Sequence, residues 1–315
     1  MASLHVNTLS LGDPFRDWLV EEVVGHRLKN KNCSVDVYKY KSSHTVCRYH
    51  FKGENFSVMA KFFAEPTGQL KDYNPYKGMM NEYLNLKKAA SVINVAKPLA
   101  INKKFNCALV TEHIPGKSLA WYFSHEEKLY EKLVAVAHML RHLHEHTKSS
   151  YNKEKEFGNY HEVLDHLKLD SNIRETFNRL LGQWWYSPLL NREYGCMVHR
   201  DVTPSNYIFC KGQPYALDFE SSWFHAHPVR DLGILTAEIK NEFELHRGGG
   251  WKAEPYIGNF LWEYSSNEKN FNYVTEVLPF FMSIGLLRSA RLHRGDYRNY
   301  LIKEARECLE AINKR

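Results

Sequence analysis

The chain has 315 residues, of which 43% are hydrophobic and 25% are charged, and its formal net charge is +6. This length suits two lobes rather than one small core, and the composition is ordinary for a globular protein. No run of the sequence approaches the ~20 apolar residues that a membrane span needs. The first residues also lack the basic and apolar regions of a secretory signal.

The charge pattern and the cysteine pattern indicate which partners and which cellular compartment to expect for this protein. No basic block with interleaved aromatic residues indicates a nucleic-acid reader, so we expect neither nucleic acid nor a membrane as a partner. The oligomeric state stays open. The six cysteines are scattered without a C-x-x-C pair, which predicts reduced thiols and a cytoplasmic location. They are Cys33, Cys47, Cys107, Cys196, Cys210 and Cys308.

The first third of the chain predicts one short helix, a set of strands and a second helix. Asp13 can cap a helix that runs to Val24, with Pro14 in its first turn. Residues of high β propensity at period two then predict three strands, Val35–Tyr40, Thr45–Phe51 and Phe56–Phe63. After a loop rich in Pro and Gly, a helix is predicted over Lys77–Val92. The residues expected to share one face of that helix are Met80, Tyr83, Leu84 and Ala90.

The sequence changes character at Pro115-Gly116, where a strand from Leu109 runs into a turn. Beyond this point the pattern is mostly helical. We therefore predict an α+β architecture, with a boundary between residues 1–115 and 116–315. Ser124-x-x-Glu127 has the spacing of a capping box before the first of these helices. The helices predicted in the second part are Leu129–His144, Ile173–Trp184, Asp231–Leu245, Tyr256–Tyr264, Tyr273–His293 and Tyr297–Ile312.

Two short motifs in the second half indicate the chemistry of phosphoryl transfer. That reaction needs a carboxylate that accepts the proton of an attacking hydroxyl, and oxygen ligands that hold Mg²⁺ on the nucleotide phosphates. Asp201, in His199-Arg200-Asp201, can supply the first. Asn206 and Asp218 can supply the second, because they follow at the spacing that this chemistry uses and Asp218 ends a hydrophobic strand. A single Asp would more often be a surface carboxylate, but the combined pattern is far more specific.

These motifs resemble the aminoglycoside phosphotransferase and choline kinase branch of the protein kinase-like fold, and the matching residues run from about Tyr38 to Tyr264. The resemblance implies a two-lobed fold, with a small β-rich nucleotide-binding lobe at 1–115 and a larger helical lobe at 116–315 that carries catalysis and acceptor binding. Val58–Phe62 looks like the third-strand lysine segment of the family. Lys61 would then contact the phosphates of ATP, and Glu82 would pair with Lys61 and hold it in position.

The resemblance also implies roles for residues around the nucleotide. Thr111–Gly116 looks like the family's hinge, in which the backbone of Glu112 and Ile114 would bind an adenine edge; a simple turn between lobes is the alternative. The turn 41–44 stands where a phosphate loop with glycine is usual. It has no glycine, although the hydroxyls of Ser42 and Ser43 could meet phosphates. ATP and Mg²⁺ are the expected cofactors.

Three further residues complete the predicted site. His199 and Asp231 are expected to support the catalytic loop without touching the reacting atoms. Glu220 replaces the glycine that protein kinases place after Asp-Phe, and it can offer a further metal ligand.

The favoured function is an ATP- and Mg²⁺-dependent kinase whose acceptor is a small hydroxyl compound: a sugar, an amino sugar, an amino alcohol or an aminoglycoside-like molecule. Trp223, Trp251 and Trp262 are candidates for its pocket, but packing is at least as good an explanation for them. Two alternatives stay open. The glycine-free turn is compatible with a pseudokinase that only binds nucleotide, and Arg200, in the His-Arg-Asp spelling of protein kinases, is compatible with an atypical protein kinase.

Overall fold

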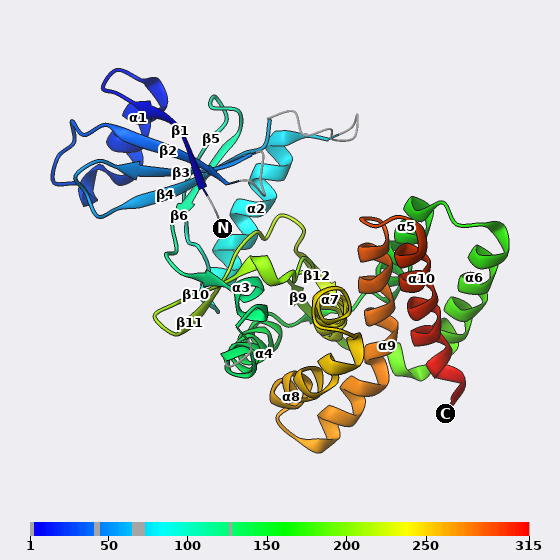
Figure 1. The fold of residues 1–315 in the computed structure, drawn as a ribbon. Coiled ribbons are helices and arrows are strands. Elements are labelled where there is room, and N and C mark those ends of the chain that lie inside the picture. The colour runs from blue at the N-terminus through cyan, green and yellow to red at the C-terminus, as the bar shows by residue number, and fades with distance from the viewer. Residues whose placement is uncertain (1–2, 41–44, 65–72, 126–127, 315) are drawn as a thin grey trace. The chain divides into compact units, whose positions relative to one another are not determined.

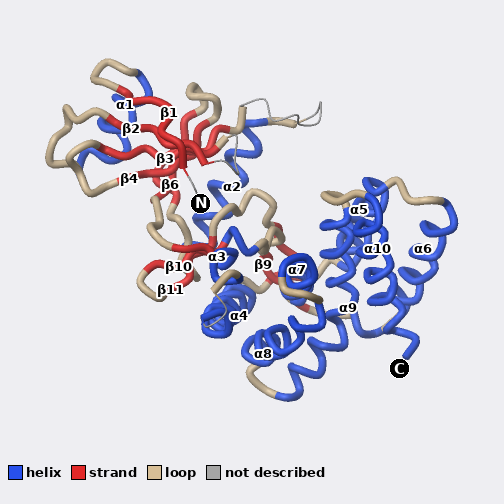
Figure 2. The backbone as a smooth tube through the Cα atoms, viewed as in Figure 1, coloured by secondary structure: helices blue, strands red, loops and turns tan. Residues whose placement is uncertain are grey.

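The computed structural model describes residues 3–40, 45–64, 73–125 and 128–314, and it divides the chain into two units. The first unit comprises residues 1–115 together with the short segment Leu217–Glu220. The second unit comprises Gly116–Ala216 and Ser221–Arg315. Figure 1 follows the chain through both units, and Figure 2 shows that strands dominate the first and helices the second. The return of Leu217–Glu220 to the first unit brings two carboxylates of the second motif to that unit.

The first unit is built on an antiparallel sheet of six strands in the order β1-β2-β3-β4-β6-β5. The three predicted strands form its centre. The edge strands β1 and β5 were not predicted, and β1 lacks a buried apolar face, since Leu4 and Val6 are both exposed. The strands are β1 Ser3–Leu9, β2 Val35–Tyr40, β3 Val46–Phe51, β4 Ser57–Phe62, β5 Pro98–Asn102 and β6 Ala108–Glu112.

One face of this sheet is covered by the predicted N-terminal helix. The helix begins as α1 (Pro14–Trp18), and the carboxylate of Asp13 caps it by accepting from two backbone N–H groups at 3.0 Å. It continues as a π-helix over Leu19–Val24 and a 3-10 turn over Gly25–Arg27. Val58 and Ala60 of β4 are buried in the same hydrophobic cluster as this segment. Because side chains alternate along a strand, Lys61 of β4 points to the opposite face.

Helix α2 (Pro75–Ala90) was predicted within two residues at each end, but the predicted face was wrong. Leu84 is 54% exposed. The buried side of the helix includes Met79, Leu86 and the charged residue Glu82, which is only 4% exposed. The apolar stripe therefore failed as a guide because an acidic side chain occupies the buried face.

The second unit is mainly helical, with two small three-stranded sheets in the orders β11-β10-β7 and β12-β9-β8. All six predicted helices are present. Helices α3 and α5 were not predicted, and Gly158 in the interior of α5 weakens its helical pattern. The helices are α3 Leu119–Phe123, α4 Leu129–His146, α5 Lys153–Leu167, α6 Ser171–Tyr186, α7 Val229–His246, α8 Glu254–Ser265, α9 Glu268–Ala290 and α10 Gly295–Glu310. The strands are β7 Lys117–Ser118, β8 Ser149–Ser150, β9 Tyr194–Val198, β10 Tyr207–Cys210, β11 Gln213–Ala216 and β12 Trp223–Ala226.

The structure bears on the cysteines and on the absence of long apolar runs in the sequence. Each of the six cysteines lies in a described part of the chain, and none of them is joined in a disulfide. Over the described ranges, no helix combines the length and the apolar character that crossing a bilayer requires.

Helices α7 and α9 approach closely because each carries a glycine at the contact. A Cβ atom on Gly233 of α7 would lie 2.5 Å from the backbone of Phe281. A Cβ atom on Gly285 of α9 would lie 2.6 Å from the Cβ of Ala237. Neither position has room for a methyl group. This contact fixes α9, which also carries a residue of the candidate active site described below.

We expect Gly233→Ala to destabilise the protein by about 1–3 kcal/mol, because the added methyl group overpacks the contact between α7 and α9. Gly158→Ala is the matched control, since Gly158 also lies in a helix and a Cβ there meets nothing within 4 Å. That change should stabilise the protein by up to ~1 kcal/mol through helix propensity. Urea unfolding of the three proteins measures both effects. Equal midpoints for the two variants would contradict the close packing.

Candidate active site

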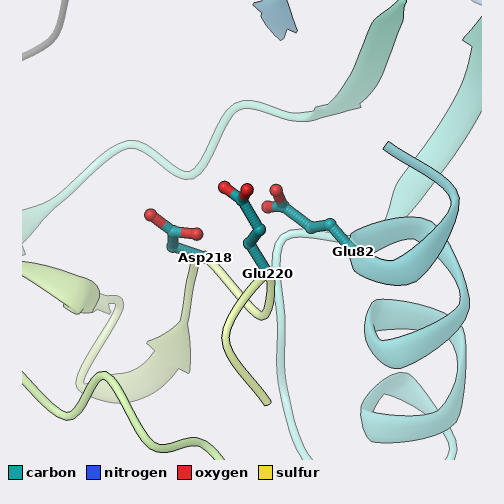
Figure 3. A group of neighbouring side chains, drawn as sticks. All are labelled: Glu82, Asp218 and Glu220. Atoms are coloured by element: carbon teal, nitrogen blue, oxygen red, sulfur yellow. The ribbon is translucent and has the colours of Figure 1, made fainter. Parts of the chain in front are cut away.

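In the first unit, the ammonium group of Lys61 lies among three carboxylates. Its Nζ atom is 2.8 Å from Glu82, 3.0 Å from Asp218 and 2.9 Å from Glu220. Figure 3 shows the three acidic side chains pointing toward one another, Glu82 from helix α2 and the other two from the segment after β11. The ion pair that the sequence predicted between Lys61 and Glu82 is thus present, and two further carboxylates share the same cation.

The local backbone of Leu217–Glu220 explains how both acidic residues reach Lys61. Asp218 has a left-handed backbone with φ of +59°, which is uncommon for a residue other than glycine. Phe219 between them is fully buried, and its carbonyl oxygen accepts from Asn85 Nδ2 at 3.0 Å. The hydroxyl of Tyr73 donates to Glu220 at 3.2 Å. The turn is therefore anchored at Phe219, with a carboxylate on each side of it.

The electrostatics of this cluster are governed by burial and by mutual charge. Burial raises the pKa of Glu82 to about 7, although Lys61 opposes the shift. Burial alone would lower the pKa of Lys61, but the carboxylates of Glu82, Asp218 and Glu220 together raise it well above its ordinary value. Lys61 therefore stays protonated across the physiological range and neutralises part of the acidic charge.

The same three carboxylates have the donor set of a magnesium site. One oxygen from each lies within 4.8 Å of the other two, and hard cations prefer such oxygen ligands. Glu82 is buried against Lys61, whereas Asp218 and Glu220 have side chains that are 43% and 33% exposed. The residues present therefore fit a hard divalent cation held by Asp218 and Glu220. Asn206, the other predicted ligand, belongs to the second unit.

In the second unit, Asp201 is held at both of its carboxylate oxygens. Arg288 of α9 donates to Oδ1 at 2.8 Å and, through its other terminal nitrogen, to the carbonyl oxygen of Arg200 at 2.6 Å. Asn206 Nδ2 lies 3.1 Å from Oδ2 and 2.9 Å from the carbonyl oxygen of Asp201. The Asp201 side chain is 28% exposed, so it is fixed in place while one edge stays accessible.

Asp231 holds the backbone that leads into Asp201. Its carboxylate accepts from the backbone N–H of His199 at 2.7 Å and from that of Arg200 at 2.8 Å. His144 Nε2 lies 3.1 Å from the same carboxylate, and His144 Nδ1 lies 2.9 Å from the hydroxyl of Tyr264. Burial alone would raise the pKa of Asp231, but the hydrogen bond and charge of His144 outweigh it and lower the pKa. Asp231 thus stays ionised in the core.

Two residues of this arrangement were not predicted from the sequence. Arg288 lies in the last turn of α9, where a basic residue is ordinary for helix electrostatics, and nothing in the sequence links it to Asp201. His144 ends the predicted helix α4 and reads as another cation of that kind. Both act through contacts 87 residues apart in the chain, and one sequence carries no signal for such contacts.

The predicted nucleotide contacts are described in part. Ser42 and Ser43 lie outside the described residues. The backbone N–H of Glu112 donates to the carbonyl oxygen of Lys97 at 3.0 Å, so an adenine edge would have to use the carbonyl oxygen of Glu112 and the N–H of Ile114. Burial lowers the pKa of His113 to about 4, with Arg48 and His50 adding to the effect, so this imidazole is neutral at the predicted hinge.

The three tryptophans considered for the acceptor pocket have different surroundings. Trp251 is 71% exposed and follows Gly248 and Gly249, whose positive φ values of +77° and +132° require glycine. Trp262 is 46% exposed and packs edge-on against Phe271. Trp223 is half-buried among cationic side chains. Packing in the core therefore does not explain Trp251, which stays a candidate for binding.

Comparison with known families supports the fold and the reaction class. The model of the phosphotransferase enzyme family matches residues 62–254, which is more than half of the chain. Lys61 lies one residue before this range, while Glu82, Asp201 and Asp218 lie within it. A search of curated proteins finds none that matches.

Several solved structures are similar over most of the chain. A choline kinase from Cryptosporidium parvum Iowa II has 14% identity and a TM-score of 0.62, with 95% of each chain covered. An ethanolamine kinase from Plasmodium vivax has 14% identity and a TM-score of 0.59, covering 95% of this chain and 88% of the other. The ADP-bound aminoglycoside phosphotransferase APH(2'')-Ib has 15% identity and a TM-score of 0.53, covering 86% and 90%. At these identities the likeness shows the fold, and it confirms the predicted two-lobed, kinase-like α+β architecture.

We expect Asp231→Asn to destabilise the protein by roughly 3 kcal/mol or more, because hydrogen bonds to a charged group each contribute ~1.5–3 kcal/mol and an amide cannot accept at both positions. Asp165→Asn is the control, since Asp165 is 67% exposed and its bridge to Arg174 is a surface pair worth at most about 1 kcal/mol.

Urea unfolding at several pH values measures this effect. Because folding lowers the pKa of Asp231, its contribution is fully present above the ordinary range of an aspartate and declines as the pH falls through the lowered pKa. A variant as stable as the wild type at neutral pH would show that Asp231 does not hold the loop.

Proposed function

We propose that this chain, which belongs to the phosphotransferase enzyme family, is a small-molecule kinase. It transfers the γ-phosphate of ATP to a hydroxyl group of a small molecule, with Mg²⁺ as cofactor. The observation that carries the proposal is the cluster of Lys61 with Glu82, Asp218 and Glu220 in the first unit. It combines a cation for phosphates with carboxylates for a metal, which are the two requirements of nucleotide binding in phosphoryl transfer.

In this proposal Lys61 contacts the phosphates of ATP, and Glu82 holds the lysine in position before the nucleotide binds. Asp218 and Glu220 would hold magnesium, together with Asn206. When bound, magnesium neutralises charge on the phosphate oxygens that develops during transfer. The backbone of Glu112 and Ile114 would bind the adenine edge.

Asp201 is proposed to accept the proton of the attacking hydroxyl group. Its position supports this role, because Arg288 and Asn206 fix the carboxylate and Asp231 fixes the backbone before it. A base whose orientation is set in advance does not have to be ordered when the acceptor arrives. His199 and Asp231 are supporting residues and do not touch the reacting atoms in this scheme.

The acceptor is proposed to be a sugar, an amino sugar, an amino alcohol or an aminoglycoside-like compound. The similar structures named above include kinases of choline, ethanolamine and aminoglycosides, which spans this range. Polycationic acceptors need several uncommitted carboxylates. In the second unit, Glu238 accepts from Ser289 and Glu263 lies 3.0 Å from His138, so both of these carboxylates are engaged within the protein. A cytoplasmic location is part of the proposal and rests on the six thiols.

The base is tested by Asp201→Asn. We expect kcat to fall by at least ~10², because general-base assistance contributes about 10²–10⁴. ADP release over a panel of sugars, amino sugars, amino alcohols and aminoglycosides identifies the acceptor on which this is measured. The shift in melting temperature with ATP and Mg²⁺ should stay as in the wild type, because Asp201 is not proposed to hold the nucleotide. Turnover at the wild-type rate would remove Asp201 from the mechanism, and the absence of any nucleotide shift in the wild type would favour the pseudokinase alternative.

Metal binding is tested by comparing Asp218→Ala with Glu220→Ala. The first change should abolish nearly all activity at every Mg²⁺ concentration, because the main metal ligand is lost. The second should be milder and partly rescued by excess Mg²⁺, since Glu220 is proposed as the additional ligand. Initial rates across a magnesium titration measure both. Full rescue of Asp218→Ala by magnesium would reverse the two assignments.

A further inference from the structure

Trp223 of β12 is surrounded by cationic side chains, all of them within the second unit. The centre of its ring lies 4.3 Å from Lys155 Nζ, 4.5 Å from Arg200 Cζ and 4.6 Å from Arg230 Cζ. The three cations come from α5, from the residue before Asp201, and from α7. Each is attracted by the face of the indole, but they repel one another, so the arrangement calls for negative charge nearby.

The protein supplies that charge for one of the three cations. Arg230 is buried and binds Glu156 and Asn159. The side chain of Arg200, in contrast, donates one hydrogen bond of 3.5 Å, to the carbonyl oxygen of Ser221. Within the described ranges, neither Arg200 nor Lys155 has a carboxylate oxygen within 4 Å. Glu162, which acts on Arg200 from farther away, is itself bound by Asn159 Nδ2 at 2.9 Å.

The polar atoms around the ring that lack partners are all donors. Trp223 Nε1 and Arg230 Nε are buried, and neither finds an acceptor among the residues that the structure describes. The guanidinium of Arg200 and the ammonium of Lys155 bring further N–H groups. None of these groups can accept a hydrogen bond. An anion with several oxygens is the chemical complement of such a set.

The cluster is also partly dehydrated. Burial lowers the pKa of Arg200 to about 10, and the neighbouring guanidinium groups of Arg230 and Arg288 add to this. Burial and Arg200 likewise lower the pKa of Lys155. Both side chains remain cationic at neutral pH. The charge of Arg200, which is partly shielded from water, attracts an anion more strongly than the same charge on an open surface.

The backbone fixes Arg200 beside the proposed base. Arg200 has a left-handed φ of +68°, its N–H is bound by Asp231, and its carbonyl oxygen is bound by Arg288. Asp201 follows directly. A conformation that is costly for a residue other than glycine persists only where its surroundings hold it, and here three residues do so. The side chain that reaches Trp223 is thus tied to the same loop that positions the carboxylate of Asp201.

We propose that Lys155, Arg200 and Trp223 form a binding site for a small oxyanion, a carboxylate or a phosphate group. The anion has two sources: an anionic group on the hydroxyl acceptor itself, or a separate small anion that binds beside it. The first source narrows the acceptor to hydroxylated acids or phosphate esters, and this part rests on the function proposed above. The binding site itself does not depend on that function.

Calorimetric titration with inorganic phosphate tests the site directly. Nucleotide and magnesium are left out. Without a metal, the carboxylates around Lys61 outnumber its ammonium group, so this cluster repels phosphate. The wild type should bind phosphate, and Lys155→Met and Arg200→Met should each weaken it by about tenfold or more, the scale of a lost charge-assisted hydrogen bond. Lys155→Arg should retain binding. Arg179→Met is the matched control, because it removes an exposed cation of the same unit from α6.

Lys155 is exposed, so its variants test the site even where Arg200→Met fails to fold. Trp223→Phe keeps the ring and removes the indole N–H, and it should weaken phosphate binding less than the loss of either cation. Wild-type protein that does not bind phosphate in the millimolar range would overturn the proposal. The same holds if Lys155→Met binds phosphate as tightly as Arg179→Met.

The source of the anion is tested by ADP release with pairs of acceptors that differ in one carboxylate, such as glycerol and glycerate or glucose and gluconate. If the acceptor carries the anion, the acid is preferred, and Lys155→Met raises KM for the acid without changing KM for the neutral partner. If neither acid is preferred while phosphate still binds, the site takes a separate anion. If no acceptor is phosphorylated while phosphate still binds, the function proposed above fails and the anion site stands.

Discussion

The positive charge of Lys61 is the constraint on which the candidate active site of the first unit depends. Without it, three carboxylates whose oxygens lie within 4.8 Å of one another would repel strongly. The three come from two separated parts of the chain, and Asp218 and Glu220 arrive through four residues that return from the second unit. The cluster therefore ties the segment Leu217–Glu220 to the sheet and to α2 of the first unit. The sheet fixes Lys61 by strand alternation, and everything else in the cluster is arranged around its Nζ atom.

The second unit also depends on the compensation of a charge, but there the central charge is negative. There a buried carboxylate, Asp231, is compensated by the N–H groups of His199 and Arg200 and by the side chain of His144. Removing one partner of a buried charge leaves the other uncompensated, which is why such groups hold a backbone more firmly than surface pairs do. Asp231 fixes the backbone that leads into Asp201, and Arg288 and Asn206 fix the oxygens of the Asp201 carboxylate. The position of the proposed base is thus set from both sides.

How far the sequence predicted this arrangement depends on the distance between the interacting residues. The change from period two to helical spacing predicted the fold class, the central strands and most helices, because these patterns are local. Motif spacing predicted Asp201, Asn206 and Asp218 as candidates, and the resemblance to the family added Lys61 and Glu82. Arg288 and the inward face of α2 were not predicted. Arg288 has the position of an ordinary cation at a helix end. Glu82 is charged but buried, so the spacing of apolar residues does not reveal that its side of α2 faces inward. Both depend on tertiary contacts that no local pattern records.

Arg200 shows how one residue can be ambiguous in sequence and specific in structure. In the sequence, Arg200 was only compatible with an atypical protein kinase as an alternative. In the structure its backbone is held by Asp231 and Arg288, and its side chain stands with Lys155 against Trp223. Asp201 therefore has the cation of Arg288 on its own carboxylate and the cation of Arg200 on the adjoining residue. A polycationic acceptor approaching Asp201 would meet this positive charge, whereas an acceptor that carries an oxyanion would reduce it. If the acceptor carries the anion, the loop that positions the base also selects the charge of the acceptor.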